Sequence, residues 1–308
     1  MNTKISQTDF AYMAGYIDGD GCFYIGKHKP KKRLKPKYII SIIISSVNTE
    51  VLYWFKSCFG GCVSLVTKEG ANSKAQYQYS IKKQNTINLA GNILPYLIEK
   101  KEECSTAIQF CSSNDIENID TCINRMKILK DVSNLVSKYH KQQFEKFRGS
   151  INPTTEDFAY LAGFIDAECS FNIQKYKPKN KPNFVYKIIL QCNNTKAPIF
   201  RWLLQRFSGQ IHFIDRRNHG KASRNQLTWR LSGKALSKII DKIHPFLKHK
   251  KPVCGELIKF YATTLTNGGA RHTQEFRSGY ADVIKIREDI ITNVHKLNLK
   301  GIKSNLSG

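Results

Sequence analysis

The 308-residue sequence has no long apolar run free of charged residues, and it has no C-x-x-C pair. The first absence argues against a membrane-spanning helix. The sequence also lacks a basic amphipathic helix with an aromatic face, which argues against binding to a membrane surface. Acidic residues are scarce, since 24 Asp and Glu stand against 49 Lys and Arg. The net charge of +25 exceeds what solubility requires and indicates a polyanionic partner, with nucleic acid as the first candidate.

The nine cysteines are odd in number and lie mostly within apolar periodic segments. This usage predicts buried free thiols in an intracellular, reducing compartment. Cys58 and Cys62 are spaced like half of a zinc site. No matching Cys or His pair follows at a usual interval, so we expect both side chains in the core.

Two stretches of the chain are near copies of each other, DFAYMAGYIDGDGCF at 9–23 and DFAYLAGFIDAECSF at 157–171. Subtraction aligns Glu168 with Asp20 (168 − 20 = 148) and Lys250 with Lys100 (250 − 100 = 150). An offset that stays at 148 to 150 residues through the whole unit predicts a tandem duplication. We expect an N-terminal repeat at 1–141, a polar linker at 142–155 and a C-terminal repeat at 156–308.

Hydrophobic periodicity predicts the same order of elements in both repeats: a helix, two strands, a helix, two strands and further helices. In the first repeat we expect helices at 9–18, 49–59, 86–93, 97–112 and 121–147, and strands at 22–28, 38–47, 62–68 and 76–82. In the second repeat we expect helices at 157–167, 195–207, 233–242, 247–265 and 280–296, and strands at 169–177, 183–192, 209–216 and 225–231.

The first helix of each repeat carries an Ala-Gly pair, which ends at Gly15 in one copy and at Gly163 in the other. Small residues on one face let two helices approach closely, so these two helices can pack against each other. The pairing would bring Asp20 and Glu168 side by side at the negative ends of both helices. Two such carboxylates repel each other, and a divalent cation is the natural remedy.

The segments MAGYIDGDG at 13–21 and LAGFIDAEC at 161–169 resemble the two signature motifs of the LAGLIDADG homing endonucleases, in their single-chain, double-motif form. The resemblance covers nearly the whole chain. It implies an α+β fold of tandem pseudo-twofold αββαββα repeats, each with a four-stranded antiparallel sheet that forms half of a DNA-binding saddle. It also implies a monomeric, Mg²⁺-dependent homing endonuclease that cuts double-stranded DNA at a long site and leaves short 3′ overhangs. An organelle, mitochondrion or chloroplast, is then the expected location.

The resemblance also implies the roles of individual residues. The metal-binding acids correspond to Asp20 and Glu168, and the backbone carbonyls of Gly19 and Ala167 correspond to further metal ligands. Asp18 and its counterpart Asp166 occupy a motif position that is structural in the family.

Two lysines outside the motif also match the family, and two residues of the second motif differ from it. Lys100 and Lys250, at matching places after a proline, resemble the active-site lysine of the family. Glu168 stands where the motif has Asp, and Cys169 stands where it has its last Gly. We expect activity to survive these departures, with unequal cutting of the two DNA strands.

Alternating strands bury one face and offer the other to a ligand, and Gln, Asn and Arg on such a face suit base readout in the major groove. The lysine-rich stretches at 27–37 and 175–182 are expected to contact phosphates. The expected DNA-facing residues are Tyr24, His28, Gln76, Gln78, Ser80, Ser170, Asn172, Gln174, Tyr176, Gln226, Thr228 and Arg230.

Two alternative functions share this scaffold. One is an RNA maturase that assists group I intron splicing, with intron RNA as its partner, and nothing in the sequence separates it from the nuclease. The other is a DNA-binding regulator that does not cleave. The presence of an acid at the same position in both repeats argues against the regulator.

Overall fold

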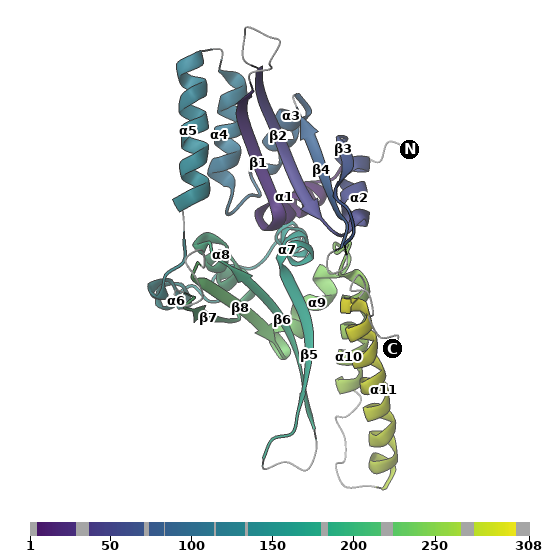
Figure 1. Ribbon diagram of the computed structural model, residues 1–308. Coiled ribbons are helices and arrows are strands. Elements are labelled where there is room, and N and C mark those ends of the chain that lie inside the picture. The colour runs from purple at the N-terminus through teal and green to yellow at the C-terminus, as the bar shows by residue number, and fades with distance from the viewer. Residues whose placement is uncertain are drawn as a thin grey trace.

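The computed structural model describes residues 5–28, 37–70, 74–82, 84–113, 115–132, 135–179, 184–216, 224–265 and 274–299. It contains two four-stranded antiparallel sheets with strand orders β1-β2-β4-β3 and β5-β6-β8-β7, which are the same topology repeated. The predicted α+β fold with tandem repeats is confirmed (Figure 1). No helix among the described residues combines the length and the apolarity needed to cross a membrane.

The elements of the first half follow the predicted order. They are α1 (Gln7–Asp20), β1 (Gly21–His28), β2 (Lys37–Ser46), α2 (Thr49–Phe59), β3 (Cys62–Thr67), β4 (Gln76–Lys82), α3 (Gln84–Ile93), α4 (Lys101–Ser112), α5 (Ile116–Val132) and α6 (Lys138–Glu145).

The second half repeats this order, except that its described residues contain no counterpart of α6. Its elements are α7 (Thr155–Glu168), β5 (Cys169–Tyr176), β6 (Val185–Asn194), α8 (Ala197–Phe207), β7 (Gln210–Ile214), β8 (Gln226–Ser232), α9 (Lys234–Ile243), α10 (Lys251–Leu265) and α11 (Gln274–Leu299).

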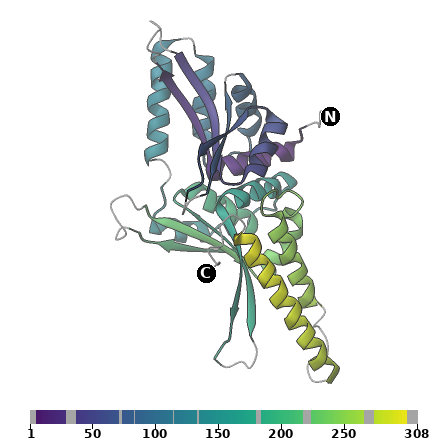
Figure 2. The same ribbon diagram turned by 45° about the vertical axis from the view of Figure 1, so that its right-hand side comes forward.

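Helices α1 and α7 lie at the centre of the molecule, with one sheet on either side of the pair (Figures 1 and 2). Each helix begins with a capping box, in which Ser6 or Thr154 accepts a hydrogen bond from the backbone N–H of Asp9 or Asp157. The side chain of the aspartate accepts a bond from the cap residue in return. The cap thus starts each helix two residues before the predicted start.

Both central helices also extend further than predicted at their C-terminal ends. The expected ends at residues 18 and 167 are wrong, because α1 continues through Gly19 to Asp20 and α7 continues to Glu168. Gly21 then takes an extended conformation, and its N–H bonds to the carbonyl of Ile17. Each acid is therefore the last residue of a rigid helix, which fixes the direction in which it projects.

The two central helices touch backbone to backbone, as the Ala-Gly pairs predict. A β-carbon on Gly15 would overlap the carbonyl oxygen of Tyr160, and one on Gly163 would overlap the carbonyl oxygen of Tyr12. Only glycine permits this approach at both positions, so the glycines set the spacing between the two halves.

Two predicted helices differ from the structure. The helix expected at 97–112 begins at Lys101, because the preceding backbone N–H groups bond to Asp18 instead of forming a helical turn. The helix expected at 121–147 is two helices, α5 and α6, and Ser137 caps the second through its partner His140. The stretch 142–155 therefore includes the end of α6, whose Phe144 is buried.

The prediction of free thiols is wrong for one pair of cysteines. Cys169 and Cys192 lie directly opposite each other in β5 and β6 and form a disulfide. Directly opposed residues of antiparallel strands are close enough for such a bridge, whereas the prediction rested on the cysteine count and the lack of a C-x-x-C pair. Cys58 is half-buried and Cys62 is exposed, so the expectation that Cys62 lies in the core is also wrong.

Gly163→Ala tests the importance of the close helix contact. The added methyl group has no room against the Tyr12 carbonyl, so we expect the free energy of unfolding to fall by about 1–3 kcal/mol in urea titrations. Gly91→Ala in α3 is the matched control, because a β-carbon there meets nothing within 4 Å. The control should be neutral or stabilising by about 0.5–1 kcal/mol, and equal destabilisation by both changes would contradict the role of the interface.

Candidate active site

The structure brings together the four residues that the family resemblance implies as metal ligands. Asp20 and Glu168 are the last residues of α1 and α7, and Gly19 and Ala167 precede them. A β-carbon on Gly19 would lie 2.5 Å from Cβ of Ala167 and 2.9 Å from Cγ of Glu168, so the two helix ends adjoin. Two carboxylates and two nearby backbone carbonyls therefore belong to one small region.

The electrostatics of the two acids are linked. Burial raises the pKa of Asp20 above its ordinary value, although Lys100 and Lys250 act in the opposite direction. Burial also raises the pKa of Glu168, the charge of Asp20 raises it further, and the same lysines oppose the change. Two neighbouring acids whose pKa values are raised by burial are stabilised as anions by a cation placed between them.

Asp18, two residues before the acid of α1, is fully buried and accepts four hydrogen bonds. Three come from the backbone N–H groups of Ile98 at 2.7 Å, Glu99 at 3.1 Å and Lys100 at 2.8 Å. The fourth comes from the hydroxyl of Tyr160 on α7 at 2.6 Å. A buried carboxylate requires such partners, and here they fix the segment that carries Lys100 against the end of α1.

Asp166 of α7 makes the same four bonds in the other half. The backbone N–H groups of Lys248, His249 and Lys250 donate to it at 2.7, 3.1 and 2.8 Å. The hydroxyl of Tyr12 on α1 donates at 2.7 Å. Burial, and then the nearby aspartate, raises the pKa of Tyr12, so the hydroxyl stays protonated and remains a donor.

The two predicted lysines lie at the ends of the central helices. The ammonium group of Lys100 donates to the carbonyl oxygens of Ile17 at 2.7 Å, Asp18 at 2.9 Å and Gly19 at 3.2 Å. These carbonyls belong to the last turn of α1, where a positive charge also interacts favourably with the negative end of the helix dipole. The ammonium group is thus held close to the acid of the same helix.

Lys250 repeats the arrangement at the end of α7. Its ammonium group donates to the carbonyl oxygens of Ile165 at 2.6 Å and Asp166 at 3.0 Å. Burial lowers the pKa of Lys250, whereas the charges of Asp166, Asp20 and Glu168 act to raise it. Both lysines therefore share one electrostatic environment with both acids.

Sequence reasoning missed the residues that precede the two lysines, Glu99 and His249. Each makes a hydrogen bond to an asparagine of the opposite repeat: Asn194 donates to Glu99 at 3.3 Å, and Asn48 contacts the ring of His249. The offset of 150 that aligns the lysines also aligns these two residues (249 − 99 = 150), so the repeat alignment alone could have identified them as a matching pair.

The chemistry at these two matching positions differs. Burial raises the pKa of Glu99 to about 8, against the effect of Lys100, so the side chain is largely protonated at neutral pH. Burial and then Lys250 lower the pKa of His249, which favours its neutral form. The two halves of the site therefore respond to pH through different groups.

The predicted DNA-facing residues fall into three groups by exposure. Gln78 and Gln226 are half-buried, and Ser80 and Thr228 are buried. His28 is the last residue of β1, but its side chain lies outside the described residues, as do 29–36 and 180–182 of the lysine-rich stretches. The exposed residues are Tyr24, Gln76, Ser170, Asn172, Gln174, Tyr176 and Arg230.

Neighbouring strands account for the two buried residues. The hydroxyl of Thr228 donates to Oδ1 of Asn193 at 2.6 Å, and the hydroxyl of Ser80 lies 3.2 Å from Sγ of Cys62. The structure therefore does not present these two hydroxyls to a ligand.

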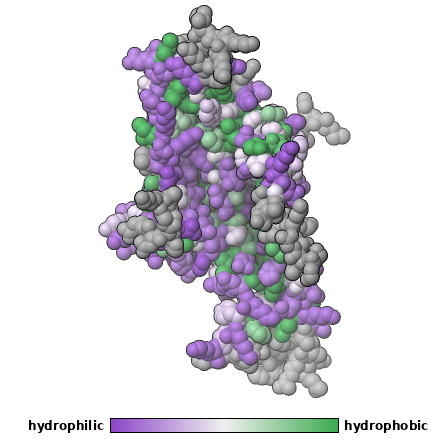
Figure 3. Space-filling view, viewed as in Figure 1, coloured by the Kyte–Doolittle hydropathy of each residue, from purple (hydrophilic) through white to green (hydrophobic). Residues whose placement is uncertain are grey.

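In the view of Figure 1, hydrophilic residues cover much of the middle of the molecular surface (Figure 3).

The donor atoms at the helix ends suit a hard divalent cation. Among the described residues, no group of three or more His, Cys, Asp and Glu side chains is arranged to hold a metal ion. A metal here would be held by the carboxylates of Asp20 and Glu168 with the carbonyls of Gly19 and Ala167. All four are oxygen donors, which fit Mg²⁺ or Ca²⁺ better than a thiophilic metal.

Comparison with known proteins supports one family. The family model described as "LAGLIDADG endonuclease" matches residues 13–107 and 161–263, which is one match in each repeat. No curated protein sequence matches the chain significantly.

Solved structures of two meganucleases share the fold. I-SmaMI bound to cleaved DNA is 16% identical, with 99% of each chain covered and a TM-score of 0.60. I-SmaMI bound to an uncleaved DNA target in the presence of calcium ions is 18% identical, with 92% of this chain and 98% of that chain covered and a TM-score of 0.59. I-AabMI bound to uncleaved DNA is 19% identical, with the same coverage and a TM-score of 0.59.

Glu99→Gln tests the burial of this carboxyl group. Because the pKa in the folded protein is raised to about 8, the wild type loses stability as the pH rises through that value. The glutamine variant should therefore match the wild type near pH 5 and be more stable at pH 9, on the order of 2 kcal/mol after solvent screening. Urea titrations at both pH values measure the difference. Glu117→Gln, on the exposed surface of α5, is the control, and the same pH-dependent gain in that variant would refute the prediction.

Proposed function

Because the chain belongs to the LAGLIDADG endonuclease family, we propose that it is a homing endonuclease that cuts double-stranded DNA with a divalent metal. In this proposal one molecule binds a long DNA site across both sheets and hydrolyses one phosphodiester bond in each strand, which leaves short 3′ overhangs. The observation that carries the proposal is the meeting of Asp20 and Glu168 at the adjoining ends of α1 and α7.

The residues of the chain have distinct tasks in this reaction. Asp20 and Glu168, with the carbonyls of Gly19 and Ala167, hold Mg²⁺. When bound, Mg²⁺ supplies an activated water and stabilises the negative charge on the phosphate. Lys100 provides positive charge beside the phosphate of one strand, and Lys250 does so for the other.

The exposed side chains on the strands are suited to reading the DNA sequence. Asn172, Gln174 and Arg230 carry amide or guanidinium groups that match the edges of adenine and guanine in the major groove. The net charge of +25 supports strong binding to the phosphates around the read bases. The similar fold of I-SmaMI, bound to an uncleaved DNA target in the presence of calcium ions, supports the same combination of DNA and divalent metal.

Asp20→Asn and Glu168→Gln test the role of the acids. Each variant should lower cleavage of the double strand by more than about 100-fold, since even the loss of groups that only orient metal ligands costs 10–100-fold. DNA binding in gel-shift assays should remain close to that of the wild type, because no base-reading residue changes. Asp282→Asn, an exposed acid on α11, should leave both activities unchanged. Full cleavage by either active-site variant would refute the proposal.

The affinity for DNA should depend steeply on salt. A protein that neutralises six to ten phosphates loses about 10³–10⁵-fold in affinity between 50 and 200 mM salt, and we expect a loss in this range. Fluorescence anisotropy with a labelled duplex at several salt concentrations measures the slope. A slope near zero would contradict an electrostatic footprint on the phosphates.

A further inference from the structure

Strands β5 and β6 form a hairpin that extends beyond the rest of their sheet, with α10 and α11 alongside (Figures 1 and 2). Strand β6 pairs with β8 only from Ile189 onwards, so the part of the hairpin nearer its turn is two-stranded. A two-stranded ribbon is marginally stable by itself in water. The direction of this hairpin therefore depends on what supports it.

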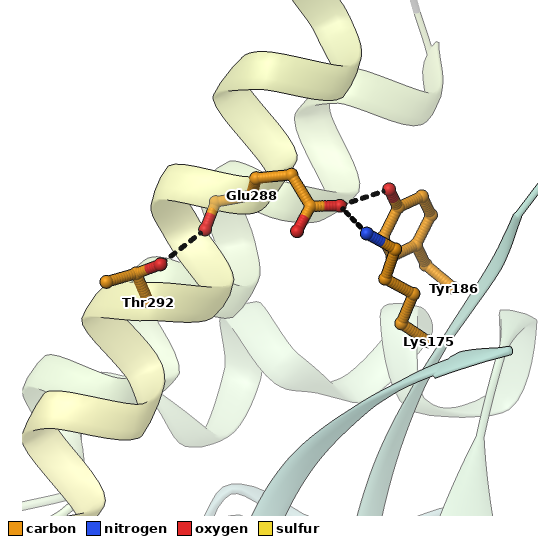
Figure 4. Close-up of polar contacts among 4 residues, drawn as sticks. All are labelled: Lys175, Tyr186, Glu288 and Thr292. Carbon is orange, nitrogen blue, oxygen red and sulfur yellow. Dashed lines mark hydrogen bonds and ion pairs between the residues drawn. The ribbon is translucent and has the colours of Figure 1, made fainter.

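Glu288 of α11 contacts both strands of this two-stranded part (Figure 4). Its Oε1 atom accepts hydrogen bonds from the ammonium group of Lys175 on β5 at 2.7 Å and from the hydroxyl of Tyr186 on β6 at 2.5 Å. Lys175 and Tyr186 are directly opposite each other in the ladder. One carboxylate thus joins the helix to a cross-strand pair.

The contact is made on the back of the proposed reading face. Lys175 follows Phe171 and Ile173 on the face of β5 that is buried against the helices. Asn172 and Gln174 alternate with these residues and project from the opposite face. Glu288 therefore contacts β5 on the face opposite Asn172 and Gln174, and it does not occupy the surface that would contact DNA.

Further contacts stabilise the packing of the hairpin against α10 and α11. The ring of Tyr186 packs edge-on against Phe260 of α10, with ring centroids 5.8 Å apart. The guanidinium of Arg287 lies 5.7 Å from the centre of the Tyr186 ring. The hydrogen bonds from Lys175 and Tyr186 lower the pKa of Glu288, so the carboxylate stays ionised and the contact is charge-assisted.

The first repeat has the same arrangement in a weaker form. Lys27 and Tyr38 are paired in β1 and β2, and Tyr38 packs edge-on against Phe110 at 6.1 Å. The acid is Asp120 of α5, whose Oδ1 lies 3.6 Å from the ammonium group of Lys27. The hydroxyl of Tyr38 is buried without a hydrogen-bond partner among the described residues. The shorter acid thus holds only one of the two strands.

We propose that Glu288 is a positioning residue for DNA recognition, which fixes the β5–β6 hairpin through Lys175 and Tyr186 and thereby sets base discrimination in the outer part of one half-site. The inference rests on the proposed function, since it requires a specific DNA site. Base readout requires donors and acceptors within hydrogen-bonding distance of the base edges. A hairpin that moves relative to the DNA would not keep its side chains at that distance from one base pair. The first repeat, with its weaker contact, sets the outer part of its own half-site less strictly.

Selection from a randomised double-stranded DNA library, followed by sequencing of the bound molecules, gives the base preference at each position. Glu288→Gln should reduce the preference at the outer positions of one half-site to about one fifth or less of the wild-type ratio, the lower end of what one base contact contributes. Preferences at the centre and in the other half-site should not change. Asp120→Asn is the matched control, and its smaller effect should fall at the opposite end of the site.

Two further variants separate positioning from folding. Tyr186→Phe keeps the ring that packs on Phe260, so it should fold and show a partial loss at the same outer positions. Lys175→Glu combined with Glu288→Lys reverses the pair and should recover part of the outer preference. Unchanged outer preference in Glu288→Gln, or an equal loss at all positions by a folded variant, would overturn the inference. If the wild type selects no sequence at all, the proposed function itself has failed.

Discussion

Two buried carboxylates, Asp18 and Asp166, are the interactions on which the rest of the molecule depends. Each is removed from water and is stabilised by four hydrogen bonds, three from its own repeat and one from a tyrosine of the other. Losing one donor would leave a buried charge short of partners, which is costly. The same bonds therefore hold the repeats together and fix the segments that carry Lys100 and Lys250.

The close helix contact adds a geometric constraint to this electrostatic one. Gly15 and Gly163 allow the backbones of α1 and α7 to touch, which brings their C-terminal ends together. Asp20 and Glu168 are the last helical residues, so helix packing alone decides how these acids lie relative to each other. A site that is built on two rigid helix ends needs no flexible loop to assemble it.

Much of the fold and of the site follows from the sequence, because the duplication and the motif are both local patterns. The sequence alone could not predict the bonds of Tyr160 to Asp18 and of Tyr12 to Asp166, since these partners are 142 and 154 residues apart. The predicted end of α1 at residue 18 is wrong because Gly19 is typical of a helix break, whereas Gly19 is helical here and lies against Ala167 of α7. Burial by neighbouring strands, as at Thr228, is likewise invisible to the alternation of polar and apolar residues.

The reciprocal tyrosine–aspartate bonds have an evolutionary consequence. Each half offers one donor and one acceptor to the same pair of groups on the other half, which is the self-complementary contact of a twofold homodimer. A single repeat with this surface could associate with its own copy, and joining two copies in one chain removes the need for them to stay identical. Positions beside the interface can then differ between the two halves, and Glu99 and His249 are chemically distinct residues at matching positions.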